Sequence, residues 1–272
     1  MATRLRWLFS RSLTKIVTAP AEESPRYIAF LVSYDGAEWC GFQRQTNAKS
    51  VQGELERALQ AILGTPTPLV MAGRTDTGVH GTGQCCRFAT TSRIPAERFP
   101  YALNTKLDRS VRITKAWEVQ RDFHPRYSAK SRLYRYSIDN AGIANPMLRR
   151  IAGHIREPLD VRAMQEAAPV FIGEHDFMAW QSAGSPAGGT VRVVKKLKIR
   201  RRRSFSSNLI EVEIEANAFL YQMVRNIVGA LIEVGRGRLS SQDLERMMRE
   251  RDRTKCPPPA PPQGLCLEKV KY

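Results

Sequence analysis

The sequence predicts an α+β protein of two similar halves, residues 23–125 and 126–272, whose sheets could join. Two observations lead to this fold class. Apolar residues recur at every second position in some segments and at every third or fourth position in others, which are the periods of strands and helices. These segments follow one another as strand, helix, strand, strand, helix, strand in the first half, and the second half has a comparable order. A cleft would lie between two such halves.

The first half begins with an apolar, β-prone run at 27–34 that ends at Asp35 and Gly36, two residues that favour a turn. A helix is expected next, because Ser50 is a typical N-cap, apolar residues from 51 to 62 share one helical face, and Gly64 is a stop signal. The other expected elements are strands at 68–72, 84–89 and 111–119 and a helix at 96–107.

In the second half, the strand expected at 209–215 alternates isoleucine and valine with glutamate, which predicts one dry face and one wet face. Four consecutive arginines at 200–203 should lie at the exposed tip of the hairpin that joins this strand to the one expected at 191–199. There they either bind phosphates or form a solvated turn. The other expected elements are strands at 133–138, 191–199 and 265–270, helices at 160–171, 218–234 and 242–251, and an extended proline-rich connector at 257–262.

The charge of the chain favours a polyanion as partner. Among 272 residues, 43 Lys and Arg stand against 26 Asp and Glu, so the formal net charge is +17. A strongly basic enzyme of this size most often meets nucleic acid, because neutralised phosphates release counterions. The alternative is a basic surface that serves solubility. No apolar run approaches about 18 residues, so no membrane association is expected.

Cysteine and histidine usage argues against a metal site. The five cysteines are odd in number and show no C-x-x-C spacing, which is typical of a reducing compartment without zinc. Adjacent Cys85 and Cys86 should point to opposite faces of a strand and serve packing. The four histidines lie far apart in sequence. Phosphate-loop and dinucleotide-binding motifs are also missing, so no metal and no cofactor are predicted.

Residues 1–22 have the composition of a mitochondrial transit peptide. They carry Arg4, Arg6, Arg11 and Lys15, several hydroxyl side chains, apolar residues at roughly helical spacing, and no acid before Glu22. The competing interpretation is a disordered basic arm that touches RNA. A mitochondrial location is therefore expected, with the cytoplasm or nucleus as the alternative if the segment is not a transit peptide.

The segment 73–81, Gly-Arg-Thr-Asp-Thr-Gly-Val-His-Gly, places one carboxylate, Asp76, among glycines directly after an expected buried strand. Catalytic groups are often found in such loops, where glycines permit a sharp turn. Asp76 is therefore a candidate nucleophile or general base, and the alternative is a turn residue that only accepts backbone hydrogen bonds. No obvious second acid accompanies it, which disfavours glycosidase chemistry of the usual kind.

Several separated segments, in order from about residue 26 onward, resemble the TruA family of tRNA pseudouridine synthases. The resemblance implies a pseudouridine synthase fold, in which two α/β halves share a mixed, mostly antiparallel central sheet. The segments are 34–36, 41–45, 50–52, 73–80, 122–126, 134–136, 173–177, 217–229 and 264–265.

The resemblance also implies roles for five residues. Asp76 matches the catalytic aspartate, Arg74 the arginine that helps to extrude the target nucleotide, and Tyr134 the tyrosine that stacks on the uracil. Arg225 matches the arginine that pairs with the aspartate, and Leu265 an apolar residue of the base pocket. From the residues alone, Tyr134 is better explained by strand packing. A buried Arg225 needs an acidic partner, which is either Asp76 or an acid elsewhere.

Four further residues of the matching segments, Thr75, His80, Phe42 and Gln43, are expected to bind the substrate. Thr77 stands where the family usually has alanine. The resemblance implies a cofactor-free conversion of uridine to pseudouridine in the anticodon stem-loop region of tRNA by a homodimer. Two alternatives stay open: an RNA-binding factor of mitochondrial ribosome assembly that keeps the fold without the activity, and the same chemistry on rRNA or mRNA.

Overall fold

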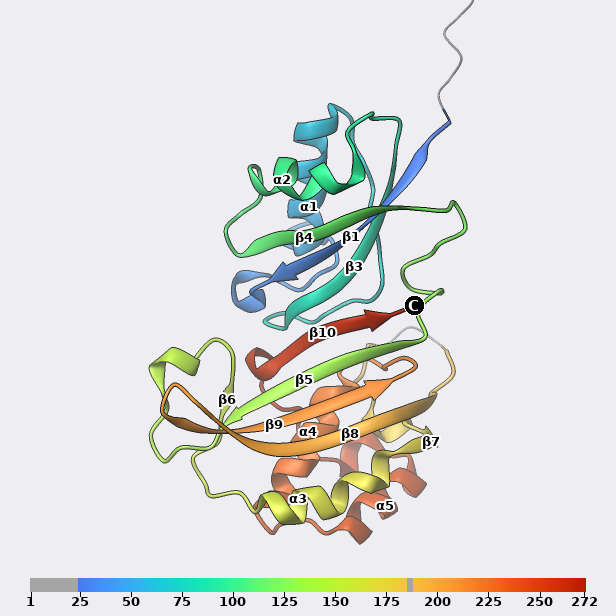
Figure 1. Ribbon diagram of the computed structural model, residues 1–272. Helices are drawn as coiled ribbons and strands as arrows, with labels where there is room; N and C mark the ends of the chain where they lie inside the picture. Colours follow the sequence, from blue (N-terminus) through green and yellow to red (C-terminus); the bar gives the residue numbers. More distant parts are fainter. Residues whose placement is uncertain (1–23, 185–187) are drawn as a thin grey trace, which may run out of the picture.

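The computed structural model describes residues 24–184 and 188–272. The N-terminal half contains two helices that pack on one face of its strands (Figure 1). Helix α1 begins after Ser50, whose hydroxyl accepts the amide hydrogen of Gly53, and ends at Gly64 in the left-handed conformation. The elements are β1 (Arg26–Tyr34), α1 (Val51–Leu63), β2 (Val70–Met71), β3 (His80–Thr90), α2 (Phe99–Asn104) and β4 (Val111–Val119).

The C-terminal half has three helices, which contribute to one apolar core against its strands. Its largest fully buried side chains include Trp180, Tyr136, Phe171 and Phe177. The elements are β5 (Ser131–Asp139), β6 (Gly153–His154), α3 (Val161–Ala167), β7 (Gly173–Asp176), β8 (Val191–Ser204), β9 (Ser207–Ala216), α4 (Met223–Gly235), α5 (Ser241–Glu250) and β10 (Leu265–Lys271). No helix of the described residues is long and apolar enough to cross a membrane.

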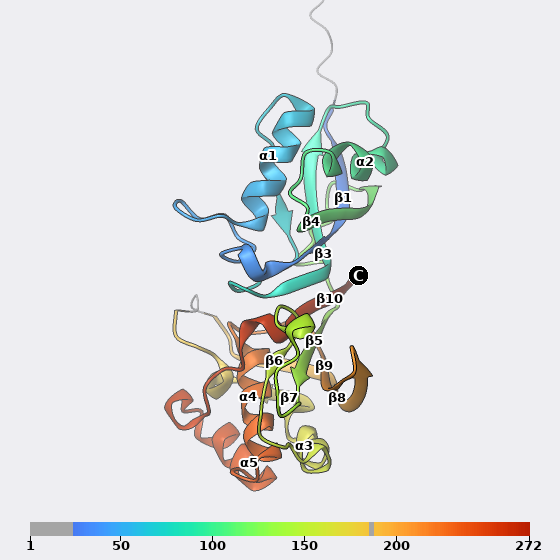
Figure 2. The same cartoon turned by 90° about the vertical axis from the view of Figure 1, so that its left-hand side faces the viewer.

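The two halves share one ten-stranded sheet in the order β4-β1-β3-β10-β5-β9-β8-β7, with β2 on β3 and β6 on β5. Strand β10 lies between the halves (Figure 2). It pairs parallel to β3 and antiparallel to β5. Only Gly fits at position 83, because a Cβ there would collide with the backbone carbonyl of Glu268. The predicted fold class, a mixed and mostly antiparallel α+β sheet, is confirmed.

Most predicted elements are present, and two of the differences in position have an evident cause. Helix α4 begins at Met223 rather than at residue 218, because Gln222 adopts a left-handed conformation with φ of 56°. The four arginines at 200–203 lie inside β8, and the hairpin turns at Phe205 and Ser206, which both have positive φ. The carboxylate of Glu211 on β9 accepts hydrogen bonds from Arg200 and Arg202, which favours continued strand pairing.

The face of β9 that carries glutamates was expected to contact water, but arginine side chains cover it. Glu211 is only 2% exposed and contacts Arg135, Arg200 and Arg202. The predicted opposite placement of Cys85 and Cys86 is confirmed, since the two side chains belong to separate apolar clusters. The prediction for residues 1–22 lies outside the described residues.

Candidate active site

The loop that carries Asp76 precedes β3 in the sequence, and its first residues lie beside that strand. It is fixed at both ends: the amide of Ala72 donates to the carbonyl of Cys85, and the amide of Val79 donates to the carbonyl of Asp76. In its middle, the carbonyl of Thr75 accepts the amide hydrogen of Phe42 at 3.1 Å. The close approach of residue 41 requires glycine, whose φ is 86°. The backbone therefore holds Asp76 in a defined position.

Asp76 forms an ion pair with Arg225 of α4, which brings together one residue from each half. Nη1 of Arg225 donates to Oδ2 of Asp76 at 3.2 Å. The side chains are 19% exposed for Asp76 and 11% for Arg225. Nε of Arg225 donates to the carbonyl of Ala260 at 2.8 Å, and the amide of Ala260 donates back to the carbonyl of Arg225. These contacts orient the guanidinium toward the carboxylate.

Two opposing effects act on the pKa of Asp76. Burial disfavours the charged form and raises the pKa, while the hydrogen bond and the charge of Arg225 lower it. Burial is the larger effect, so the pKa is raised above that of an ordinary aspartate. A carboxylate with little water around it keeps its lone pairs available for a reacting atom. Arg225 is the group that favours its ionised form.

Tyr134 lies on β5, close enough to Asp76 for the negative charge of Asp76 to affect it. Burial and that charge both raise the pKa of Tyr134, so it stays a neutral phenol. Its ring meets the ring of Phe219 edge to face, with centroids 5.1 Å apart. Leu265, the first residue of β10, is 5% exposed and pairs with Tyr136 of β5. The aromatic ring of Tyr134 thus lies near the carboxylate.

Arg74 differs from these residues because it is exposed. Within residues 24–184 and 188–272 it has no hydrogen bond or ion pair. Its position two residues before Asp76 places an unpaired guanidinium beside the carboxylate loop. Such a group can meet an anionic substrate without first breaking a contact within the protein.

The family model for tRNA pseudouridine synthase matches residues 30–128 and 167–272. The chain belongs to this family. It is similar to the tRNA pseudouridine synthase A of Thermoanaerobacter sp. (strain X514), with 42% identity over 91% of this chain and 100% of that protein. The enzyme of the same name from Moorella thermoacetica is 43% identical over 89% of this chain and 97% of its own length.

A structural match is much weaker than these sequence matches. A Cbf5-Nop10-Gar1 complex shares 13% identity and a TM-score of 0.32, over 76% of this chain and 45% of that chain. This similarity is too low to support a conclusion. Membership of the family therefore rests on the sequence relatives and the family model.

Three of the residues expected to bind substrate, Thr75, Phe42 and His80, contact other residues of the protein. The hydroxyl of Thr75 lies 2.9 Å from that of Tyr34. Phe42 is fully buried against the ring of Tyr34. His80 accepts the amide hydrogen of Gly36 at Nδ1, and its Nε2 lies 2.6 Å from the carbonyl oxygen of Arg150. These contacts hold the segment around Asp76 in place. Gln43 is partly exposed.

Sequence reasoning missed two residues that position this loop. Gln84 of β3 is fully buried and donates through Nε2 to the carbonyl of Gly73 at 2.7 Å. Tyr34 holds Thr75 from the end of β1. Gln84 begins an otherwise apolar stretch of strand, and that position was a usable signal. Tyr34 lies in the matching segment 34–36, but its residue type did not distinguish it, because a tyrosine is common in strands.

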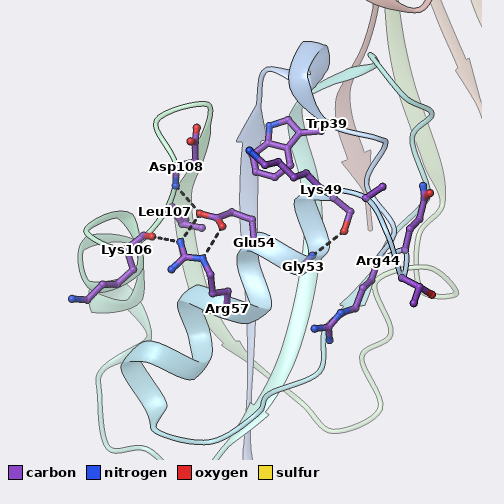
Figure 3. Close-up of a pocket in the computed structure, with 13 residues that line it drawn as sticks. Trp39, Arg44, Lys49, Gly53, Glu54, Arg57, Lys106, Leu107 and Asp108 are labelled. Atoms are coloured by element: carbon purple, nitrogen blue, oxygen red, sulfur yellow. Dashed lines mark hydrogen bonds and ion pairs between the residues drawn. The ribbon is translucent and has the colours of Figure 1, made fainter.

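An open hollow of about 630 Å³ lies in the N-terminal half between α1 and the turn before β4 (Figure 3). The proposed catalytic residues do not line it. Glu54 links the two sides of the hollow, because its carboxylate binds the guanidinium of Arg57 on α1 and accepts the amide hydrogen of Asp108 in the turn before β4. Its charged lining residues are four cations and two acids, Arg44, Lys49, Arg57, Lys106, Glu54 and Asp108. This basic, polar surface suits a phosphate backbone better than a small apolar ligand.

Proposed function

We propose that this protein is an isomerase that converts uridine to pseudouridine in tRNA, with Asp76 as its nucleophile. The observation that carries the proposal is the ion pair between Asp76 and Arg225, in which a largely buried carboxylate faces one cation at 3.2 Å. The family match and the name shared by the relatives identify the reaction class. A basic chain with a net charge of +17 suits a polyanionic substrate.

The reaction needs one carboxylate and no cofactor. Asp76 attacks the target nucleotide or abstracts a proton from it, and the bond between N1 of uracil and C1′ of ribose breaks. The uracil turns, a bond forms between C5 and C1′, the proton on C5 is lost, and N1 gains a proton. Atoms and electrons balance within the substrate, so the product is an isomer.

Each neighbour of Asp76 has a defined part in this proposal. Arg225 keeps the carboxylate ionised and oriented. Tyr134 offers a neutral ring for stacking on the uracil. Arg74, which is exposed, enters the space that the target nucleotide leaves when it turns out of its stack. Leu265 supplies apolar contact for the base.

The substitution Asp76→Asn tests the proposal, because it keeps the size of the side chain and removes its charge and nucleophilicity. We expect no pseudouridine in an unmodified tRNA transcript and unchanged binding of that transcript in a gel-shift assay. Glu97→Gln, the same loss of charge at an exposed position outside the matching segments, is the control and should remain active. Full activity of Asp76→Asn would show that another residue is the nucleophile.

Several finer parts of the function are also proposals. We infer that the target uridines lie in the anticodon stem-loop region, that the protein acts as a homodimer, and that it resides in mitochondria. The basic, hydroxyl-rich residues 1–22 support the location. Pseudouridine mapping of organellar tRNA and rRNA with and without the protein tests the target, sedimentation tests the dimer, and fusion of residues 1–22 to a fluorescent protein tests the location.

The same mapping separates the alternatives. An RNA-binding factor of mitochondrial ribosome assembly would bind RNA without forming product. The same chemistry on rRNA or mRNA would leave tRNA uridines unmodified. Intact Asp76, Arg74, Tyr134 and Arg225 favour an active enzyme over both an inactive factor and a decayed site.

A further inference from the structure

We propose that His124, Arg126 and Tyr127 form a platform on which an unpaired base of the RNA stacks beside the target uridine. The platform lies in the segment between β4 and β5, where the chain passes from one half to the other. This inference rests on the proposed function, since it concerns how the RNA is held at the same site.

The two aromatic rings of the platform lie in contact, and that of Tyr127 is open to solvent. The rings of His124 and Tyr127 have centroids 4.3 Å apart and planes inclined by 34°. Tyr127 is 76% exposed, and the guanidinium of Arg126 lies 5.7 Å from the centre of its ring. An exposed aromatic ring beside a cation is the combination that binds single-stranded nucleic acid, because every base offers a face for stacking.

Hydrogen bonds of the backbone hold the turn that carries the platform. Nδ1 of His124 accepts the amide hydrogens of Arg126 and Tyr127, so Nε2 carries the proton of the neutral ring. The hydroxyl of Ser128 accepts the amide hydrogen of His124 at 3.0 Å. Burial and the charges of Arg87 and Arg126 lower the pKa of His124, so it is neutral at neutral pH. Preorganisation of this kind reduces the entropic cost of binding.

Arg132 connects the platform to the catalytic loop. Its Nη2 donates to the carbonyl of Arg126 at 2.6 Å and to the carbonyl of Ala72 at 3.3 Å. Ala72 lies two residues before Arg74, and Tyr134 lies two residues after Arg132 on β5. Two residues along a strand span roughly 7 Å. The platform therefore lies close to the residues that would handle the target nucleotide.

The surroundings of the platform are positively charged. Arg132 donates only to backbone carbonyls and has no carboxylate partner among the described residues. Burial and, to a smaller extent, the charge of Arg126 lower the pKa of Arg192. Uncompensated arginines beside an exposed ring favour a ligand that offers both phosphate and a base. RNA has both, whereas an apolar protein partner lacks the negative charge.

The test compares two exposed tyrosines. Tyr127→Ala removes the platform, and Tyr101→Ala removes a ring that is 73% exposed on α2. Both changes are made in the Asp76→Asn protein, and affinity for an unmodified tRNA transcript is measured at several salt concentrations. We expect Tyr127→Ala to weaken binding by on the order of tenfold. Tyr127→Phe, which keeps the ring, and Tyr101→Ala should leave the affinity nearly unchanged.

Two further readouts separate stacking from charge and from chemistry. Arg126→Gln should reduce the slope of log Kd against log salt by about one, while Tyr127→Ala should leave that slope unchanged. With Asp76 intact, Tyr127→Ala should raise KM and leave the single-turnover rate at saturating protein unchanged, because the ring does not touch the reacting atoms.

Equal affinities of Tyr127→Ala and Tyr101→Ala would overturn the platform. A loss of affinity that coincides with a change of sedimenting mass would also overturn it, because Tyr127 would then contact a second protein chain. The unsubstituted protein is assayed on the same transcript for pseudouridine. Absence of product there contradicts the proposed function, whereas product with unchanged Tyr127→Ala binding contradicts only the platform.

Discussion

Replacing Arg225 by methionine should change the pH dependence of the reaction as well as its rate. Asp76 must be ionised to act as a nucleophile, so activity falls as the pH drops through its pKa. Burial raises this pKa and Arg225 lowers it. Without the guanidinium, burial is unopposed and the pKa rises further. The acid limb of a plot of kcat/KM against pH should therefore move to higher pH in Arg225→Met.

The size of the rate effect follows from the geometry. Two unit charges 3.2 Å apart interact by about 5 kcal/mol at an effective dielectric constant of about 20, which is an upper bound. Hydrogen bonds to charged groups contribute about 1.5 to 3 kcal/mol net. At about 1.4 kcal/mol per factor of ten, kcat/KM on the alkaline side of the limb should fall by about 10- to 150-fold.

The assay measures pseudouridine formed in a tRNA transcript across the pH range, with thermal unfolding recorded for each variant. Arg225→Lys keeps the charge and should restore part of the original pH dependence. Arg162→Met is the control, because Arg162 forms an exposed ion pair with Glu166 on α3. A fall in kcat/KM without movement of the acid limb would refute the reasoning, since Arg225 would then act independently of Asp76.

Three further changes test the support of the site. Glu211→Gln leaves three arginines without their buried carboxylate and should lower the free energy of unfolding in urea by about 2 to 3 kcal/mol. An unchanged free energy of unfolding would mean that water replaces the carboxylate. Gly83→Ala forces a methyl group against the carbonyl of Glu268 and should cost about 2 kcal/mol or more, with faster proteolysis between the halves. Tyr34→Phe removes the hydrogen bond to Thr75 and should reduce kcat about fivefold with little change in KM, a result that equal changes in both would contradict.

Local sequence patterns predicted the elements of both halves, because apolar periodicity and capping residues act over a few neighbouring positions. Ser50 caps α1 as expected. A buried Arg225 needs an acid, and the resemblance implied that this acid is Asp76. The structure contains that contact. The catalytic roles of both residues stay predictions.

Features that depend on distant pairing could not be predicted in this way. The parallel pairing of β10 with β3 joins residues such as Cys266 and His80, which are far apart in sequence. The arginines at 200–203 resembled a charged turn because their partner, Glu211, lies across a hairpin whose register was unknown. Tyr34 acquires its role only because the Asp76 loop folds back over it.

The position of β10 sets a constraint on folding during synthesis of the chain. Strands β3 and β5 leave the ribosome well before residues 265–271. Until β10 arrives, the edge of each that faces the other half is paired only in part, by β2 on β3 and by β6 on β5. Exposed strand edges are sites of aggregation, and pairing between distant segments is slow. Until β10 is made, the nascent chain therefore contains two half-sheets that are not joined and whose edges can pair with other chains.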